Sequence, residues 1–278
     1  MSRRIILHIG SPKCGSTYLQ KVMQQNADAL LARGIRYPAP PPDHPGNAGG
    51  IETIDRATLE GYFAGGVHTV ILSHEDLYSK ARLSDALTRL AKEDGTEIQV
   101  IAFLRPFSDF LFGDYSQFMK QNFDRYLATR NPFDGRSFRD MIDRRVKSLR
   151  PARFLGNWQA KIPEPRLIVA GHRDIRPVME DLLGPDLDLD WSVDRHTTNP
   201  SLRMEDCDRI AEAMLRSDVP DEVIKSMFLS AFHKTGRADT GRSLARRRVI
   251  EALFEEQNAA VLAQFGYDNR LALDPAAE

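Results

Sequence analysis

Short apolar runs alternate with longer segments of helical period along the first two thirds of the chain. The clearest strand candidates are residues 5–9, 67–72, 98–104 and 167–170. Between the first two runs, apolar residues recur at helical spacing from Leu19 to Leu31, and Gly34 follows as a helix stop. This alternation predicts the α/β class, with a central parallel sheet flanked by helices on both faces. Ligands of such sheets bind beyond the carboxyl ends of the strands.

Two stretches interrupt the regular pattern. Residues 37–50 are rich in proline and glycine, so they can continue neither a helix nor a central strand, and we expect a loop that can serve as a lid. From Ser201 onward the pattern is mostly helical, with a break at residues 234–242. A single domain is expected over residues 1–272, followed by a disordered tail at residues 273–278.

Composition narrows the possible partners. The chain of 278 residues has 38 basic and 39 acidic side chains, a formal net charge of -1, so no overall field favours nucleic acid or an anionic membrane surface. Cys14 and Cys207 lie far apart, which indicates a reducing compartment rather than a disulfide framework. The apolar stretch after Arg4 is too short for a secretory signal, and no apolar run approaches the ~20 residues of a membrane span. We therefore expect a cytoplasmic protein; its oligomeric state is not predicted.

The first strand leads directly into Gly10-Ser11-Pro12-Lys13-Cys14-Gly15-Ser16-Thr17, which runs into the first helix. A strand, a glycine-containing loop and a helix in this order form a cradle for anions. The glycines allow close backbone approach, and the N–H groups at the start of the helix point toward a phosphate. Ser16 and Thr17 add hydroxyl donors.

The loop departs from the nucleotide-triphosphate pattern G-x-x-x-x-G-K-[ST] at one position. Gly10, Gly15 and Thr17 match the pattern, but Ser16 occupies the place of the lysine, and the lysine stands earlier, at Lys13. In the triphosphate enzymes that lysine reaches the β- and γ-phosphates, and the following hydroxyl helps to hold Mg²⁺. The displacement argues against a phosphotransferase that uses ATP and Mg²⁺, which is one alternative function.

The run Pro12-Lys13-Cys14-Gly15-Ser16-Thr17 resembles the 5'-phosphosulfate loop, roughly P-K-x-G-[ST]-[ST], of the sulfotransferases that use 3'-phosphoadenosine 5'-phosphosulfate (PAPS). The form is similar to that of many bacterial members of this branch of the P-loop superfamily. The resemblance implies a P-loop NTPase-like sulfotransferase fold and transfer of a sulfuryl group from PAPS to a hydroxyl or amine of an unidentified small-molecule, glycan or lipid acceptor. It also implies that these six residues bind the cofactor and that Lys13 stabilises the leaving phosphate.

A second part of the resemblance concerns the 3'-phosphate. The apolar strand ends at Arg105, similar to the family's arginine that grips this phosphate, but the serine expected eight residues later is Gly113. Arg105 then supplies most of the charge-assisted contact unless Ser108, Ser116 or a basic side chain compensates. A non-catalytic nucleotide-binding adaptor domain is therefore a second alternative function.

Transfer to a hydroxyl requires a base beside the attacking oxygen. The strand at residues 67–72 leads into Ser73-His74-Glu75, which puts two titratable groups at its carboxyl end. The resemblance gives two answers: His74 matches the strand-ending Lys-Thr-His of eukaryotic cytosolic members, and Glu75 matches the Ser-Ser-Glu of many bacterial members. Because adjacent strand residues point to opposite faces, the two cannot serve equally. The bacterial pattern slightly favours Glu75.

Other residues are weaker candidates. His44, in the proline-glycine loop, and Asn199, similar to an Asn-x-Ser-Leu element of bacterial members, are candidates for acceptor binding. Lys234, Arg237 and Arg242 lie where family members often have a late glycine-rich basic loop, although a solvated loop explains them equally well. No histidine stands at metal-ligand spacing from cysteines or carboxylates, so we expect neither a structural zinc nor a catalytic metal.

Overall fold

The structure is a computed structural model that describes residues 2–42, 44–162, 166–184, 186–193 and 200–272. Its contacts divide the chain into two compact units. The first, which we call the sheet unit, comprises Met1–Arg105, Pro151–Thr198 and Ala263–Tyr267. The second, the helical unit, comprises Pro106–Arg150, Asn199–Leu262 and Asp268–Glu278. The expectation of a single domain over residues 1–272 stays a prediction, and the expected tail at 273–278 lies outside the described residues.

The sheet unit is built on a five-stranded sheet in the order β2-β3-β1-β4-β5. All pairings are parallel, which confirms the α/β class with a central parallel sheet. His8 lies opposite Ser73 of β3 and Ile101 of β4, so the carboxyl ends of three neighbouring strands meet at one edge. The strands are β1 (Arg4–His8), β2 (Ile35–Arg36), β3 (Thr69–Ser73), β4 (Glu97–Leu104) and β5 (Leu167–Gly171).

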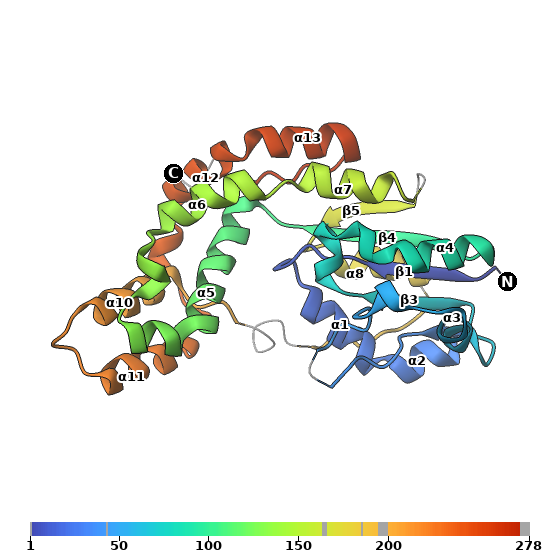
Figure 1. Ribbon diagram of the computed structural model, residues 1–278, viewed down its shortest axis with the longest axis horizontal. Helices are drawn as coiled ribbons and strands as arrows, with labels where there is room; N and C mark the ends of the chain where they lie inside the picture. Colours follow the sequence, from blue (N-terminus) through green and yellow to red (C-terminus); the bar gives the residue numbers. More distant parts are fainter. Residues whose placement is uncertain (1, 43, 163–165, 185, 194–199, 273–278) are drawn as a thin grey trace. The chain divides into compact units, whose positions relative to one another are not determined.

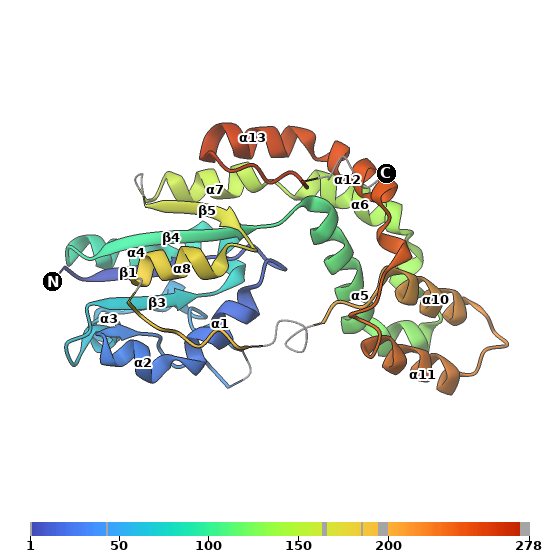
Figure 2. The same ribbon diagram turned by 180° about the vertical axis from the view of Figure 1, so that it is seen from behind.

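Helices cover both faces of this sheet. Figure 1 shows α4 in front of the strands, and Figure 2, seen from behind, shows α8 in front of them. One face packs Ile6, Ile71 and Phe103 against apolar residues of α1 and α8. Successive side chains of a strand point to opposite faces of the sheet. Because the central strands are apolar at nearly every position, both faces of the sheet are apolar. The helices here are α1 (Ser16–Gln25), α2 (Ala27–Ala32), α3 (Arg56–Phe63), α4 (Asp85–Glu93), α7 (Pro151–Gln159) and α8 (Ile175–Leu183), with short 3-10 helices η1 (Ile51–Thr53), η2 (Glu75–Ser79) and η3 (Ala81–Ser84).

The helical segment expected from Leu19 to Leu31 is broken at Asn26. The Asn26 amide donates to the carbonyl of Val22 at 2.8 Å and to that of Asp190 at 2.9 Å, and its oxygen accepts the N–H of Asp190 at 2.8 Å. An asparagine that bonds to backbone groups in this way competes with the helix, so α1 ends and α2 begins there. Gly34 follows α2 with a φ of 71°, as expected for a helix stop.

The helical unit has its own apolar core. Aromatic rings from separate segments stack in it: the ring centroids of Phe123 and Phe228 lie 3.8 Å apart, and those of Phe107 and Phe254, which lies between α12 and α13, are 4.1 Å apart. Its elements are α5 (Phe107–Thr129), η4 (Pro132–Gly135), α6 (Phe138–Ser148), α10 (Met204–Leu215), α11 (Asp221–Phe232), η5 (Thr240–Arg242) and α12 (Leu244–Leu253), and α13 (Glu255–Phe265) begins in it. Within the described ranges, no helix has both the length and the apolar character that crossing a bilayer requires.

Candidate functional site

The glycine loop joins β1 to α1 at the carboxyl edge of the sheet. Its backbone takes left-handed conformations at Gly10, Lys13 and Gly15, with φ of 106°, 64° and 92°. A side chain at Gly10 would lie 3.1 Å from the backbone of Glu75, so the loop needs a glycine where it passes the end of β3. Gly15 is the N-cap of α1 and has no side chain to cap it, which leaves the first N–H groups of this helix for a ligand.

Arg105 follows β4 and holds the loop in place. Its guanidinium donates to the backbone carbonyl of Lys13 at 2.6 Å. The loop is also paired with β4 through its backbone. The N–H of Ser11 donates to the carbonyl of Phe103 at 2.9 Å, and the N–H of Phe103 donates to the carbonyl of Gly10 at 2.7 Å. The structure therefore brings together the two predicted cofactor anchors, the Lys13 loop and Arg105.

Two buried polar atoms at this place lack a protein partner within the described residues: Nε of Arg105 and Oγ of Ser16. A buried polar group without a hydrogen bond is costly, typically by about 1–3 kcal/mol, and such groups need an explanation. A guanidinium N–H and a serine hydroxyl are both donors to phosphate or sulfate oxygens. These donors, beside the start of α1, fit an anionic cofactor such as the predicted one.

Cys14, in the middle of the loop, is not a nucleophile at neutral pH. The side chain is 1% exposed, and burial raises the pKa of its thiol to about 11, although the nearby Arg105 opposes this shift. Its sulfur lies 3.0 Å from the hydroxyl of Ser11. Cys14 and Cys207 are both free cysteines. Cys14 therefore packs in the apolar core of the sheet unit.

The two candidate bases differ in what surrounds them. Glu75 is the first residue of η2, and one of its carboxylate oxygens accepts from the Gln20 amide at 3.3 Å. His74 instead caps η2: its Nδ1 accepts the N–H of Asp76 at 3.2 Å. Glu75 thus lies against α1, the helix that follows the cofactor loop, whereas one nitrogen of His74 is already used in a turn. This arrangement favours Glu75 as the base, which stays a prediction.

His44 lies beside both candidates. Its ring stacks on that of His74, with centroids 4.7 Å apart and planes at 12°, and its Nε2 is 4.0 Å from the Glu75 carboxylate. The other nitrogen, Nδ1, accepts the N–H of Gly46 at 2.9 Å, so in the neutral ring the proton is on Nε2, facing Glu75. The proline-glycine loop therefore supplies a further polar side chain beside Glu75, and the role of His44 in acceptor binding stays a prediction.

A network of buried polar side chains connects Glu75 to β3 and β1. The Gln20 amide donates to the hydroxyl of Ser73 at 3.0 Å as well as to Glu75, and Nδ1 of His8 lies 2.8 Å from the same hydroxyl. Asn47 fastens the proline-glycine loop to β3, because it accepts the N–H of Ser73 at 2.8 Å. His8, Gln20 and Asn47 were not among the residues predicted from the sequence. The sequence does contain a sign of two of them, because each is a polar residue within an apolar pattern: His8 stands in an apolar strand, and Gln20 stands on the apolar face of a helix.

His8 should make folding dependent on pH. Burial lowers the pKa of its imidazole to about 3, whereas an unfolded histidine titrates near about 6.5. Between these values the unfolded chain binds the extra proton, so the free energy of unfolding falls as the pH falls, by about 2–3 kcal/mol from pH 6 to pH 4. We expect urea midpoints measured over this range to change less with pH in His8→Gln than in the wild type. The same pH dependence in both proteins would contradict the assignment.

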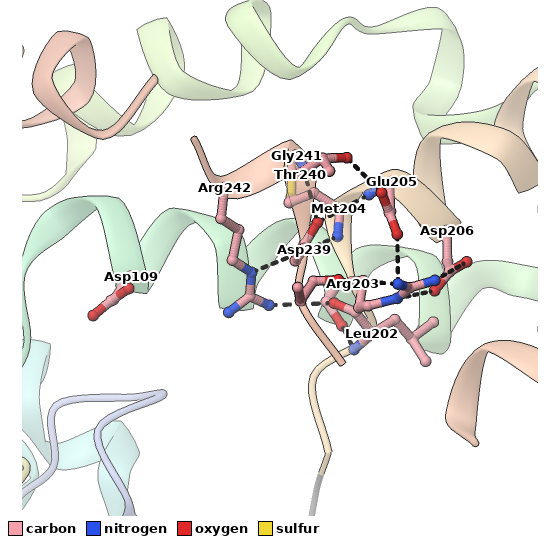
Figure 3. Close-up of polar contacts among 12 residues, drawn as sticks. Asp109, Leu202, Arg203, Met204, Glu205, Asp206, Asp239, Thr240, Gly241 and Arg242 are labelled. Carbon is pink, nitrogen blue, oxygen red and sulfur yellow. Dashed lines mark hydrogen bonds and ion pairs between the residues drawn. The ribbon is translucent and has the colours of Figure 1, made fainter. Parts of the chain in front are cut away.

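The late basic loop is engaged within the helical unit. Arg242 forms an ion pair with Asp239 at 2.9 Å and donates to the carbonyl of Leu202 at 3.3 Å, as Figure 3 shows. Lys234 lies 3.9 Å from the Asp206 carboxylate, whereas Arg237 is exposed. These contacts hold the segment against the start of α10, which favours a structural role for Arg242. Asn199, the other candidate for acceptor binding, lies outside the described residues.

The residues proposed to compensate for Gly113 are also buried in the helical unit. The hydroxyl of Ser116 accepts the N–H of Leu202 at 2.7 Å, so it is used to fix the chain before α10. Ser108 is fully buried, and its hydroxyl oxygen has no hydrogen bond to any part of the chain that the structure describes. Among the described residues, no three histidine, cysteine, aspartate or glutamate side chains gather in a way that would hold a metal ion.

Comparisons with known proteins give a distant similarity at the level of structure. No family model matches the sequence, and no curated protein matches it. The chain is similar in structure to a sulfotransferase from Alicyclobacillus acidocaldarius, with 14% sequence identity and a TM-score of 0.47 over 96% of this chain and 98% of that chain.

Proposed function

We propose that this protein is a sulfotransferase that uses PAPS to sulfate a hydroxyl or an amine of its acceptor. The observation that carries the proposal is the convergence of the Lys13 loop, Arg105 and Glu75 at one edge of the parallel sheet. The buried donors on Arg105 and Ser16 that lack a protein partner among the described residues support an anionic ligand there. The early lysine of the loop supports a phosphosulfate rather than a triphosphate.

Each residue has a role in this proposal. PAPS, when bound, supplies a sulfuryl group on a phosphate leaving group. The N–H groups at the start of α1 and the hydroxyls of Ser16 and Thr17 bind the 5' end, and Arg105 binds the 3'-phosphate. Lys13 neutralises the negative charge that develops on the leaving phosphate, the kind of preorganised electrostatic contribution that is usually the largest in catalysis.

The acceptor side of the proposed site is formed by Glu75, Gln20 and His44. Glu75 takes the proton from the acceptor as the new bond to sulfur forms, because a hydroxyl is a weak nucleophile until its proton is removed. Gln20 holds the carboxylate by its amide at 3.3 Å, which limits the orientations of Glu75. His44, stacked on His74, contacts the acceptor from the proline-glycine loop.

Thermal unfolding with two ligands tests the proposed cofactor. A ligand that binds only the folded chain stabilises it, by about 2.7 kcal/mol at 100 times its Kd, and adenosine 3',5'-bisphosphate should therefore raise Tm by about 5 °C. ATP with Mg²⁺ at the same concentration should raise Tm by much less. We expect Arg105→Gln to reduce the shift, whereas Arg89→Gln, on the exposed side of α4, should leave it unchanged. A larger shift with ATP and Mg²⁺ would replace the sulfotransferase proposal by a phosphotransferase.

A further inference from the structure

The helical unit contains a cavity of about 470 Å³ that takes no part in the proposed sulfuryl transfer. Its volume is within the range of about 300–1,000 Å³ that is usual for small-molecule sites. The cavity lies between α5, η4 and α6, all within this unit. Its lining consists of Phe118, Asn122, Arg125, Tyr126, Phe133, Asp134, Arg136, Met141, Arg144, Arg145, Lys147 and Ser148.

Two helices present one face each to this cavity. On α5 the lining residues run from Phe118 to Tyr126 at successive spacings of four, three and one. On α6, Met141, Arg144, Arg145 and Ser148 follow at spacings of three, one and three, and Lys147 lies at the edge of the same face. Residues at such spacings lie on one side of a helix. The inner side of the cavity, which we call its floor, is aromatic. It is formed by the rings of Tyr126 and Phe133, which are 2% and 4% exposed, and by the partly buried ring of Phe118. A flat apolar group fits this floor.

The rim of the cavity is strongly basic. Five of its lining residues are cationic and only Asp134 is anionic, so the lining has a formal charge of 5 − 1 = +4, whereas the whole chain has -1. Asp134 pairs with Arg125 and lies 3.9 Å from Arg136, and Arg145 is held by Asp114 at 2.7 Å. Internal carboxylates thus neutralise part of the rim.

Two cationic side chains of the rim are not neutralised by a carboxylate of the described residues. Arg144 and Lys147 are exposed near the end of α6, and neither side chain has a hydrogen bond or ion pair with any residue in the described ranges. A cation in the last turn of a helix is favourable by itself. That effect does not explain why both cations border a cavity with an aromatic floor. An anion above the rings would complete the charge balance.

The backbone under the cavity is strained. Phe133 and Asp134 have φ of 53° and 55°, the left-handed region that costs a residue other than glycine about 1–3 kcal/mol. This conformation stacks the ring of Phe133 on Tyr115, with centroids 4.1 Å apart, and directs Asp134 to Arg125. Such strain is concentrated at ligand sites, where the surrounding structure maintains it.

We propose that this cavity is a binding site for an aromatic anion, a flat ring system that carries a phosphate, sulfate or carboxylate group. The ring lies on Phe118, Tyr126 and Phe133, and Arg144 and Lys147 bind the anionic group. The proposal does not rest on the proposed sulfotransferase activity, because the cavity shares no residue with the site on the sheet unit.

Calorimetric titration of the full chain with 1-naphthyl phosphate tests this site. Adenosine 3',5'-bisphosphate is present at saturation, so that the glycine loop is filled. We expect Arg144→Gln combined with Lys147→Gln to weaken binding about tenfold or more, because two charge-assisted contacts are lost. Arg139→Gln is the matched control, since Arg139 lies on the same helix outside the lining and pairs with Asp143. Neutral 1-naphthol should bind at least about tenfold more weakly than its phosphate.

Three results would overturn the proposal: no binding of 1-naphthyl phosphate up to millimolar concentration, equal binding by the double variant and the wild type, or loss of binding in Lys13→Met with the double variant unaffected. The last result would locate the anion at the glycine loop instead. Failure of the proposed sulfotransferase activity is distinguishable, because it concerns the response to adenosine 3',5'-bisphosphate, which the double variant should retain.

Discussion

Replacing Lys13 by methionine should lower turnover about 10³-fold, to be checked by following the release of adenosine 3',5'-bisphosphate from PAPS with an acceptor mixture. Removing one preorganised group that stabilises developing negative charge costs about 10²–10³ in kcat, and a full charge at the leaving phosphate belongs at the upper end of this range. Methionine keeps the length of the side chain, and the Lys13 carbonyl that accepts from Arg105 is unchanged. The effect should therefore be on chemistry more than on folding.

The control for this variant is Lys21→Met, an exposed lysine of α1 one turn beyond the loop. It should have the turnover of the wild type, and both variants should unfold at the temperature of the wild type without ligand. A Lys13→Met protein with unimpaired turnover would remove the lysine from the reaction. If turnover fell only because the bisphosphate no longer bound, Lys13 would be a binding group and not a catalytic one.

Glu75→Gln should reduce turnover about 10²-fold or more while the affinity for adenosine 3',5'-bisphosphate stays unchanged, because loss of a general base typically costs 10²–10⁴-fold. Glutamine is almost the same shape, and its carbonyl oxygen can still accept the Gln20 amide that now lies 3.3 Å from the carboxylate. The change therefore removes the basic group with little change in packing. Single-turnover rates and the Kd of the bisphosphate, measured separately, check the two parts of this expectation.

The neighbouring carboxylate provides the comparison. Asp76→Asn alters an exposed residue that pairs with Lys80 at 3.0 Å, so it should leave turnover within about twofold of the wild type. His74→Gln should have a smaller effect than Glu75→Gln. If Glu75→Gln turns over at the rate of the wild type and His74→Gln does not, the base is His74 and the histidine pattern of the eukaryotic members applies.

The sheet was predictable from sequence because each central strand is apolar on both faces. The runs at 5–9, 67–72, 98–104 and 167–170 became β1, β3, β4 and β5 with ends shifted by a few residues. Only β2, two residues long, was missed. Its pairing with β3 depends on the turn at Gly34, whose carbonyl accepts the N–H groups of His68 and Thr69 at 2.9 and 3.2 Å. Such a local contact has no periodic pattern.

The predicted site residues came from motifs, which name residues but not their partners. The approach of His44 to Glu75 was not predictable, because it depends on Asn47, which ties the proline-glycine loop to β3. The role of Gln20 was likewise hidden, since periodicity identifies the buried face of α1 but not the polar group that lies opposite. Similarly, the helical pattern after Ser201 gave no indication that these helices pack with α5 and α6 in a core of their own.

The hydrogen bond from Arg105 to the Lys13 carbonyl has a consequence for how proteins with this loop can diverge. A single guanidinium both shapes the turn and is proposed to grip the far end of the nucleotide, so a substitution there alters two recognition elements at once. A change of cofactor during evolution would therefore require simultaneous substitutions at the end of β4 and in the glycine loop. To redesign the nucleotide preference, the glycine loop and the end of β4 should be replaced together.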